Sequence, residues 1–164
     1  MKFFKKAVFL FITLFLIWIL LTGLHPQELI IGAIVALIIM LIFLGSAEIF
    51  AEIKLTPKAF VFWLIYIFVF LWELIKSNLD VAFRVLNPKL PINPGIVKVK
   101  TNLKSKIGRI ILANSITLTP GTLTVETKDD FFYIHWIDIS STDIEGATNA
   151  IVAKFEKYLE VIFG

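Results

Sequence analysis

The residues best suited to chemistry lie in one polar stretch, residues 112–126, which reads LANSITLTPGTLTVE. It carries Asn114, Ser115 and a Pro120-Gly121 pair in a chain that is 58% hydrophobic. It also holds four threonines: Thr117, Thr119, Thr122 and Thr124. Hydroxyls gathered in this way suggest either a nucleophile or a set of oxygen ligands for a cation such as Na⁺.

Neither kind of site is well supported by the surrounding residues. A serine or threonine nucleophile needs a general base and an acid that orients the base. The best candidate base, His135, lies within the aromatic segment FFYIHWIDI of residues 131–139, which is expected to be a strand. No carboxylate occurs within residues 114–122 to complete a Na⁺ site. A membrane-anchored enzyme and an ion site therefore stay as minor alternatives.

Local structure explains most of the stretch without any chemistry. Residues 114–115 fall near the expected end of a helix, where such side chains satisfy free backbone groups. Pro120 and Gly121 fit the two central positions of a type II turn, which needs glycine for its positive φ. The strand that follows is expected to bury Leu123 and Val125 and to expose the threonines between them.

The composition of the chain points to a membrane protein. Its hydrophobic share exceeds that of ordinary soluble domains, and its mean hydropathy is +0.87. The absence of cysteine excludes disulfides and thiolate sites, and two histidines make a histidine metal site improbable. We therefore predict no cofactor and no metal. A net charge of +3 gives little support for binding nucleic acid.

Two uncharged segments, residues 7–24 and 29–44, are separated by HPQE and predict a transmembrane helical hairpin. A cleaved signal peptide is disfavoured because a second apolar segment follows at once, without a typical cleavage site. Gly32 and Ala36 form a small-xxx-small face suited to close helix packing. Neither segment contains Asp, Glu, Lys, Arg or His, so this chain alone is not expected to move protons across a membrane.

A third helix of about thirty residues is predicted between Pro57 and Pro88. Its first part, residues 59–72, is apolar but short for a span, and its continuation to residue 86 is amphipathic. We expect it to lie along the membrane or to pack obliquely on neighbouring subunits. A third crossing is the alternative.

Positive charge predicts the orientation in a cell membrane. Three lysines precede the first segment, the hairpin turn has no Lys or Arg, and eight Lys or Arg residues lie between positions 76 and 109. Because basic residues favour the cytoplasmic side, both ends are expected to be cytoplasmic, which favours two crossings.

The chain divides into a membrane helical region, residues 1–88, and a cytoplasmic α+β domain, residues 89–164. The order in that domain is predicted as β-α-β-β-α, with helices on one face of a small sheet. Ile107, Ile110 and Ile111, with Asn114, are expected on one side of the first helix. The last helix is expected to run unbroken to residue 163 from a capping box of Thr142 and Glu145.

The order of several segments resembles one known family. ANSITLTPGTLTVE of residues 113–126, followed by FFYIHWID of residues 131–138, is similar to the signature of the E subunits of multisubunit cation/proton antiporters of the Mrp (Mnh) type. An apolar N-terminal hairpin and the segments KSNLDVAFRVLNP and INPGIVKVKT precede the motif in the order that the family shows, so the resemblance covers the whole chain.

The resemblance implies an accessory, non-catalytic subunit in an assembly where larger subunits exchange Na⁺ for H⁺. Its partners would be other membrane subunits and the lipid bilayer. The same module is also associated with archaeal membrane-bound hydrogenase and sulfane-reductase complexes, which is an alternative context. A small homo-oligomeric transporter is a further rival. The family brings no catalytic residues, and we expect an interface at Gly32, Ala36 and within residues 114–121, namely Asn114, Ser115, Thr117, Thr119, Pro120 and Gly121.

Overall fold

The computed structural model describes residues 2–45, 52, 54 and 56–164. The chain packs as two compact units, Met1–Ile53 and Lys54–Gly164. The boundary expected between residues 88 and 89 divides a membrane region from a water-exposed domain, which is a different criterion from packing. That boundary stays a prediction. By packing, the long third helix belongs with the C-terminal elements.

The first unit consists of α1 (Lys2–Thr22) and α2 (Pro26–Phe43), which pack against each other. Gly23 ends α1 with a φ of +87°, and Pro26 opens α2 at its first turn, where a missing N–H costs nothing. Gly32 and Ala36 are buried where α2 meets α1. A Cβ added at Gly32 would lie 2.3 Å from Cδ1 of Trp18, so only glycine fits there.

The second unit begins with α3 (Pro57–Leu86), a helix of 30 residues with the predicted bounds. Thr56 caps it by accepting a hydrogen bond from the N–H of Ala59 at 3.1 Å. By length and composition, α2 and α3 are each long and apolar enough to cross a membrane, while residues 6–22 of α1 form a shorter apolar helix.

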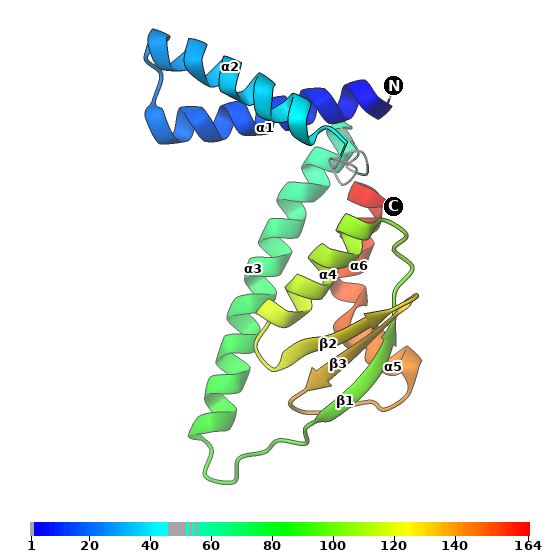
Figure 1. Ribbon diagram of the computed structural model, residues 1–164. Coiled ribbons are helices and arrows are strands. Elements are labelled where there is room, and N and C mark those ends of the chain that lie inside the picture. The colour runs from blue at the N-terminus through cyan, green and yellow to red at the C-terminus, as the bar shows by residue number, and fades with distance from the viewer. Residues whose placement is uncertain (1, 46–51, 53, 55) are drawn as a thin grey trace. The chain divides into compact units, whose positions relative to one another are not determined.

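Three antiparallel strands form the sheet of the second unit: β1 (Gly95–Lys100), β2 (Thr122–Lys128) and β3 (Phe131–Trp136). Their order is β1-β3-β2, and the hairpin between β2 and β3 turns at Asp129, whose φ is +50°. α4 (Lys106–Leu118) packs on β2 and α5 (Ile144–Ile151) packs on β1, while α6 (Ala153–Phe163) packs against α3, α4 and α5 (Figure 1). The core includes Val99, Phe132, Ile134, Phe155 and Leu159.

The predicted last helix is wrong in two respects. It is interrupted at Val152, so the order of elements is β-α-β-β-α-α. The N–H of Phe155 bonds the carbonyl of Val152, three residues back, at 3.0 Å. The cap is Asp143 and not Thr142: its carboxylate accepts a hydrogen bond from the N–H of Gly146 at 2.7 Å.

The predicted buried faces of α4 and β2 are also wrong. Ile110 is exposed, and α4 instead buries Leu112, Ser115 and Ile116. In β2 the apolar Leu123 and Val125 are exposed, while the threonines beside them turn inward toward α4. Hydrogen bonds to the backbone of α4 hold these threonines on the inner face. An alternation of hydropathy along the strand cannot predict such bonds.

Candidate functional site

The threonines of residues 117–124 close the C-terminal end of α4. The last carbonyls of a helix have no partner within the helix and must be satisfied from outside. Thr122 Oγ1 donates to the carbonyl of Ile116 at 2.6 Å, and Thr119 Oγ1 donates to that of Ser115 at 2.7 Å. In β2, Thr124 Oγ1 donates to the carbonyl of Ala113 at 3.1 Å. The hydroxyls therefore fasten β2 to α4.

The turn between α4 and β2 has the features predicted for type II. The N–H of Thr122 bonds the carbonyl of Thr119 at 3.3 Å, and Gly121 has a φ of +92°. A Cβ at Gly121 would approach Cγ2 of Ile137 to 3.0 Å. Glycine is thus required at this position by both backbone conformation and space.

The stretch is also the place where α4 meets α3. Ser115 is buried and hydrogen-bonded to the hydroxyl of Tyr66, which is only 4% exposed in the middle of α3. Aromatic rings extend the contact between α3 and α6. Trp63 packs edge-on against Phe163 with ring centroids 5.9 Å apart, and Tyr66 against Phe155 at 6.4 Å.

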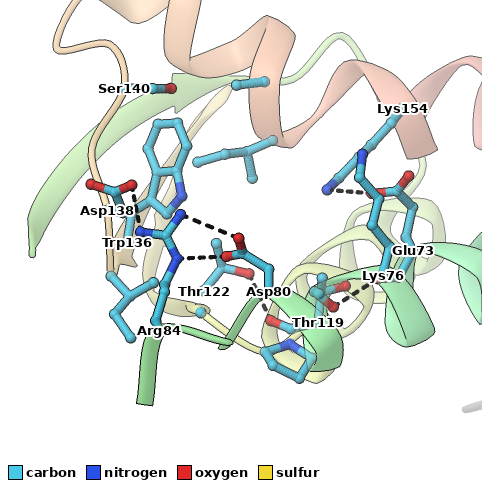
Figure 2. Close-up of a pocket in the computed structure, with 16 residues that line it drawn as sticks. Glu73, Lys76, Asp80, Arg84, Thr119, Thr122, Trp136, Asp138, Ser140 and Lys154 are labelled. Atoms are coloured by element: carbon cyan, nitrogen blue, oxygen red, sulfur yellow. Dashed lines mark hydrogen bonds and ion pairs between the residues drawn. The ribbon is translucent and has the colours of Figure 1, made fainter. Parts of the chain in front are cut away.

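A cavity of about 330 Å³ lies where α3, the Thr119–Thr122 turn and the end of β3 come together (Figure 2). Its charged lining residues include Glu73, Lys76, Asp80, Arg84, Asp138 and Lys154. Most of these charges compensate one another. Arg84 bonds both Asp80 and Asp138 at 2.7 Å, and Lys154 bonds Glu73 at 3.0 Å. The Arg84–Asp138 and Lys154–Glu73 pairs, like Tyr66 and Ser115, fasten α3 to the α+β elements.

The charges that line the cavity are balanced. Among the described lining residues, the basic and acidic groups are equal in number and no histidine occurs. His135 lies on the exposed face of the sheet, whereas Ser115 is buried beneath α3, so the candidate base and this hydroxyl do not meet. Over the described ranges, no cluster of three metal-binding side chains occurs.

The predicted interface residues fall into three groups. Asn114 and Thr117 are exposed, Ser115 and Thr119 are buried within this chain, and Pro120 and Gly121 line the cavity. Gly32 and Ala36 belong to the other compact unit, where they pack on α1. Thr117 and Gly121 also make internal hydrogen bonds, with Thr124 and Ile137, and contact with a partner stays a proposal for all the predicted residues.

The sequence did not predict which residues of α3 bond to the α+β elements. The bonds that Tyr66 and Arg84 make with the α+β elements span 49 and 54 residues of sequence, and nothing local marks them as partners. One signal was available, because Tyr66 places a hydroxyl in the middle of an otherwise apolar run. A buried phenol of this kind needs a hydrogen-bond partner.

Comparison with known proteins identifies the family. The model of the family described as "Na+/H+ ion antiporter subunit" matches residues 11–162. The E1 subunit of the Na(+)/H(+) antiporter of Staphylococcus haemolyticus is 36% identical over 145 residues, covering 82% of this chain and 86% of the relative. The E subunit of the Na(+)/H(+) antiporter of Alkalihalophilus pseudofirmus is 47% identical over 76 residues, and that match spans 45% of this chain and 48% of the relative.

A solved structure extends the similarity to the fold. A chain in the archaeal membrane-bound sulfane sulfur reductase, a respiratory membrane complex, is 48% identical with a TM-score of 0.85, covering 97% of this chain and 99% of that one. The resemblance drawn from residues 113–126 is confirmed. Because the family model covers both the apolar hairpin and the threonine cap of α4, this chain belongs to the family of E subunits of Na+/H+ antiporters.

Proposed function

We propose that this chain is an accessory, non-catalytic subunit of a multisubunit Na+/H+ antiporter, supporting the assembly in which larger subunits exchange the ions. The observation that carries the proposal is the use made of the hydroxyl-rich stretch. The protons of its buried hydroxyls are engaged in capping α4, and Ser115 also bonds Tyr66, which supports a structural use of the stretch.

The hairpin supports the same conclusion. Carriers that move protons keep ionisable groups inside the bilayer. The hydroxyls of Thr13 and Thr22 bond carbonyls of their own helix, at 2.9 and 3.0 Å. Residues 7–24 and 29–44 contain no ionisable side chain. The hairpin is therefore suited to packing against other membrane helices, and other membrane subunits are the partners we propose.

A second context is favoured by one comparison. The similar chain in the sulfane sulfur reductase is matched over nearly its full length at 48% identity. As the alternative context, we propose that this chain is a subunit of a respiratory membrane complex of that kind. The proposed role, support of assembly without catalysis, is the same in both contexts.

We further propose that α1 and α2 cross the membrane and that both chain ends are cytoplasmic, with the α+β domain of residues 89–164 in the cytoplasm. The basic N-terminus and the basic residues 76–109 favour the inside, which requires an even number of crossings. Contacts of α3 argue against a third crossing. At one end of the contact region Phe62 lies beside Tyr158, and at the other Arg84 is bonded to Asp138. The helix between Phe62 and Arg84 is about 33 Å long.

A bilayer has a hydrocarbon core of about 30 Å. If α3 crossed it, the elements packed along α3 would enter the bilayer as well, including the exposed Lys157 and Glu160 of α6. Each charge at the bilayer centre costs about 2.5–3.5 kcal/mol on insertion scales. An α3 outside the hydrocarbon core avoids this cost.

Reconstitution tests the functional proposal. The purified chain alone in liposomes should give no Na⁺-dependent proton flux, while the intact complex, reconstituted in parallel, should give it. Flux from the chain alone would overturn the accessory role. The topology is tested by Asp130→Cys in this cysteine-free chain: a membrane-impermeant maleimide should label it in inverted vesicles and not from outside. Efficient outside labelling would indicate three crossings.

A further inference from the structure

The outer half of α3 carries a long, exposed apolar stripe. The residues that define it include Phe60, Phe68, Trp72, Leu79, Phe83 and Leu86, all of them exposed. Projected at about 100° per residue, these six lie within an arc of about 140°. Phe68 is 72% exposed and Leu86 is 78% exposed, so the stripe runs through both the apolar and the amphipathic halves of the helix.

The charges of α3 are arranged around this stripe in a definite way. Its two acids, Glu73 and Asp80, are paired with Lys154 and Arg84 on the side that faces the α+β elements. Lys58 and Lys76 are exposed and lie 18 residues apart, which is five helical turns. They therefore fall on the same edge of the stripe, about 27 Å from each other.

We propose that the stripe of α3 lies in the surface of the bilayer, with Lys58 and Lys76 bound to the headgroups of anionic lipids along one edge. This inference rests on the two-crossing topology proposed above and names the partner of the third helix. The stripe sinks among the acyl chains near the headgroups, and the α+β domain remains on the water side of the helix.

Two observations favour lipid over a protein partner. A helix lying in the interface combines an apolar face rich in Trp, Phe and Leu with basic residues at its border, which is the arrangement of α3. The charges that border the stripe directly are Lys58 and Lys76, which complement an anionic surface, while the exposed Asp80 lies further round the helix and is paired with Arg84. A partner helix would cover a narrow seam, whereas the apolar arc of α3 occupies well over a third of its circumference.

Depth measurements test the orientation. In the complex reconstituted in liposomes, Phe68→Cys, Ile75→Cys and Leu86→Cys are labelled one at a time with bimane, and quenching is compared for lipids brominated near the headgroup and deep in the acyl chain. A helix lying in the surface gives equal, shallow depths at all three positions. A depth that increases steadily along the helix would overturn the proposal in favour of a span. Absence of quenching by every lipid would overturn it in favour of protein covering the stripe.

Charge reversal tests the headgroup contacts. Bimane at Ile75→Cys should be quenched more by brominated phosphatidylglycerol than by brominated phosphatidylcholine, by up to about fivefold, the factor for one lysine at an anionic surface. Lys58→Glu with Lys76→Glu should abolish this preference. Lys106→Glu with Lys128→Glu, an equal change of charge at exposed positions of α4 and β2, should preserve it. Equal quenching by both lipids in the unaltered helix would refute the lysine contacts.

The test separates this inference from the functional proposal. Recovery of the larger subunits with the chain tests its role in assembly, and the depth profile tests only α3. If the depths showed that α3 spans the membrane while the chain still recovered its partners, the surface-helix proposal would be refuted and the accessory role would stand.

Discussion

The hydroxyl of Tyr66 in α3 is hydrogen-bonded to Oγ of Ser115 in α4, across 49 residues of sequence. Ser115 Oγ also donates to the carbonyl of Ile111 at 2.8 Å, so its single proton is used there and Tyr66 is the donor of the pair. This bond links the middle of the apolar third helix to the hydroxyl-rich stretch by which the family is recognised. The stretch is thus a structural joint between α3 and the α+β domain.

The direction of the bond predicts unequal effects of removing its two sides. Ser115→Ala leaves the buried phenol of Tyr66 without an acceptor and should lower the free energy of unfolding by about 1–3 kcal/mol. Tyr66→Phe removes the donor while Ser115 keeps Ile111, so the loss should be about 0.5–1.5 kcal/mol. The double variant should resemble Tyr66→Phe, because the unsatisfied hydroxyl is gone. Unfolding of the full chain in detergent, followed by tryptophan fluorescence, measures all three, and equal single effects would contradict the assignment.

The Pro-Gly turn predicts a cost for any side chain at residue 121. Gly121→Ala forces alanine into a φ of +92° and places its Cβ 3.0 Å from Ile137, so we expect destabilisation of at least about 1 kcal/mol. Gly45→Ala serves as the control, because a Cβ there meets nothing within 4 Å and no positive φ is involved. Midpoints of thermal unfolding of the two variants should differ. A neutral Gly121→Ala would show that the turn tolerates the side chain.

A buried carboxylate in α6 provides a third prediction. Glu156 Oε1 accepts hydrogen bonds from Thr101 Oγ1 at 2.5 Å and from the N–H of Asn102 at 2.8 Å. Glu156→Ala leaves both donors without this acceptor and should destabilise the chain by about 1–3 kcal/mol. Glu160→Ala, one turn further along and exposed, should change stability by no more than about 0.5 kcal/mol. Comparable losses in denaturant titrations of the two variants would argue against a structural role for Glu156.

The cap of α5 predicts a pH dependence. Hydrogen bonds from Ser141 and from the N–H of Gly146 lower the pKa of Asp143 below its usual value of 3.8. A lowered pKa means that the ionised carboxylate stabilises the folded chain above pH 3.8 and that this contribution is lost as the pH falls through the folded pKa. The carboxyl ¹³C shift of Asp143 should therefore titrate below 3.8, and Ser141→Ala should move the midpoint upward. A titration midpoint at or above pH 3.8 in the unaltered chain would contradict this role of the cap.

The sequence predicted elements well where local signals mark their ends. Pro57 and Pro88 were the signals for the third helix, and the observed α3 begins at Pro57 and ends at Leu86. The Pro120-Gly121 turn was predicted by the need for a positive φ, which is a property of the backbone alone. Such features depend on neighbours within a few residues and can be read without a tertiary structure.

Faces that are decided by distant contacts could not be read in this way. In β2, alternation of hydropathy assigned Leu123 and Val125 to the core, but hydrogen bonds from Thr122 and Thr124 to α4 turn the strand over. Ser115 bonds Tyr66, and Asp138 bonds Arg84. Both partners lie in α3, and nothing in their neighbouring sequence identifies them as partners. The family inferred from residues 113–126 was correct. The threonines of that stretch were nevertheless expected to face solvent, whereas they bond the backbone of α4.

Native extraction tests the central claim most directly. The full chain carrying an affinity tag is expressed in its own host, extracted in a mild detergent, and separated by native electrophoresis and mass spectrometry. The account predicts that it migrates with several larger membrane subunits, and that Thr117→Val, at an exposed position of the stretch, lowers their recovery. A chain recovered as a clean monomer or a small homo-oligomer would contradict the accessory role.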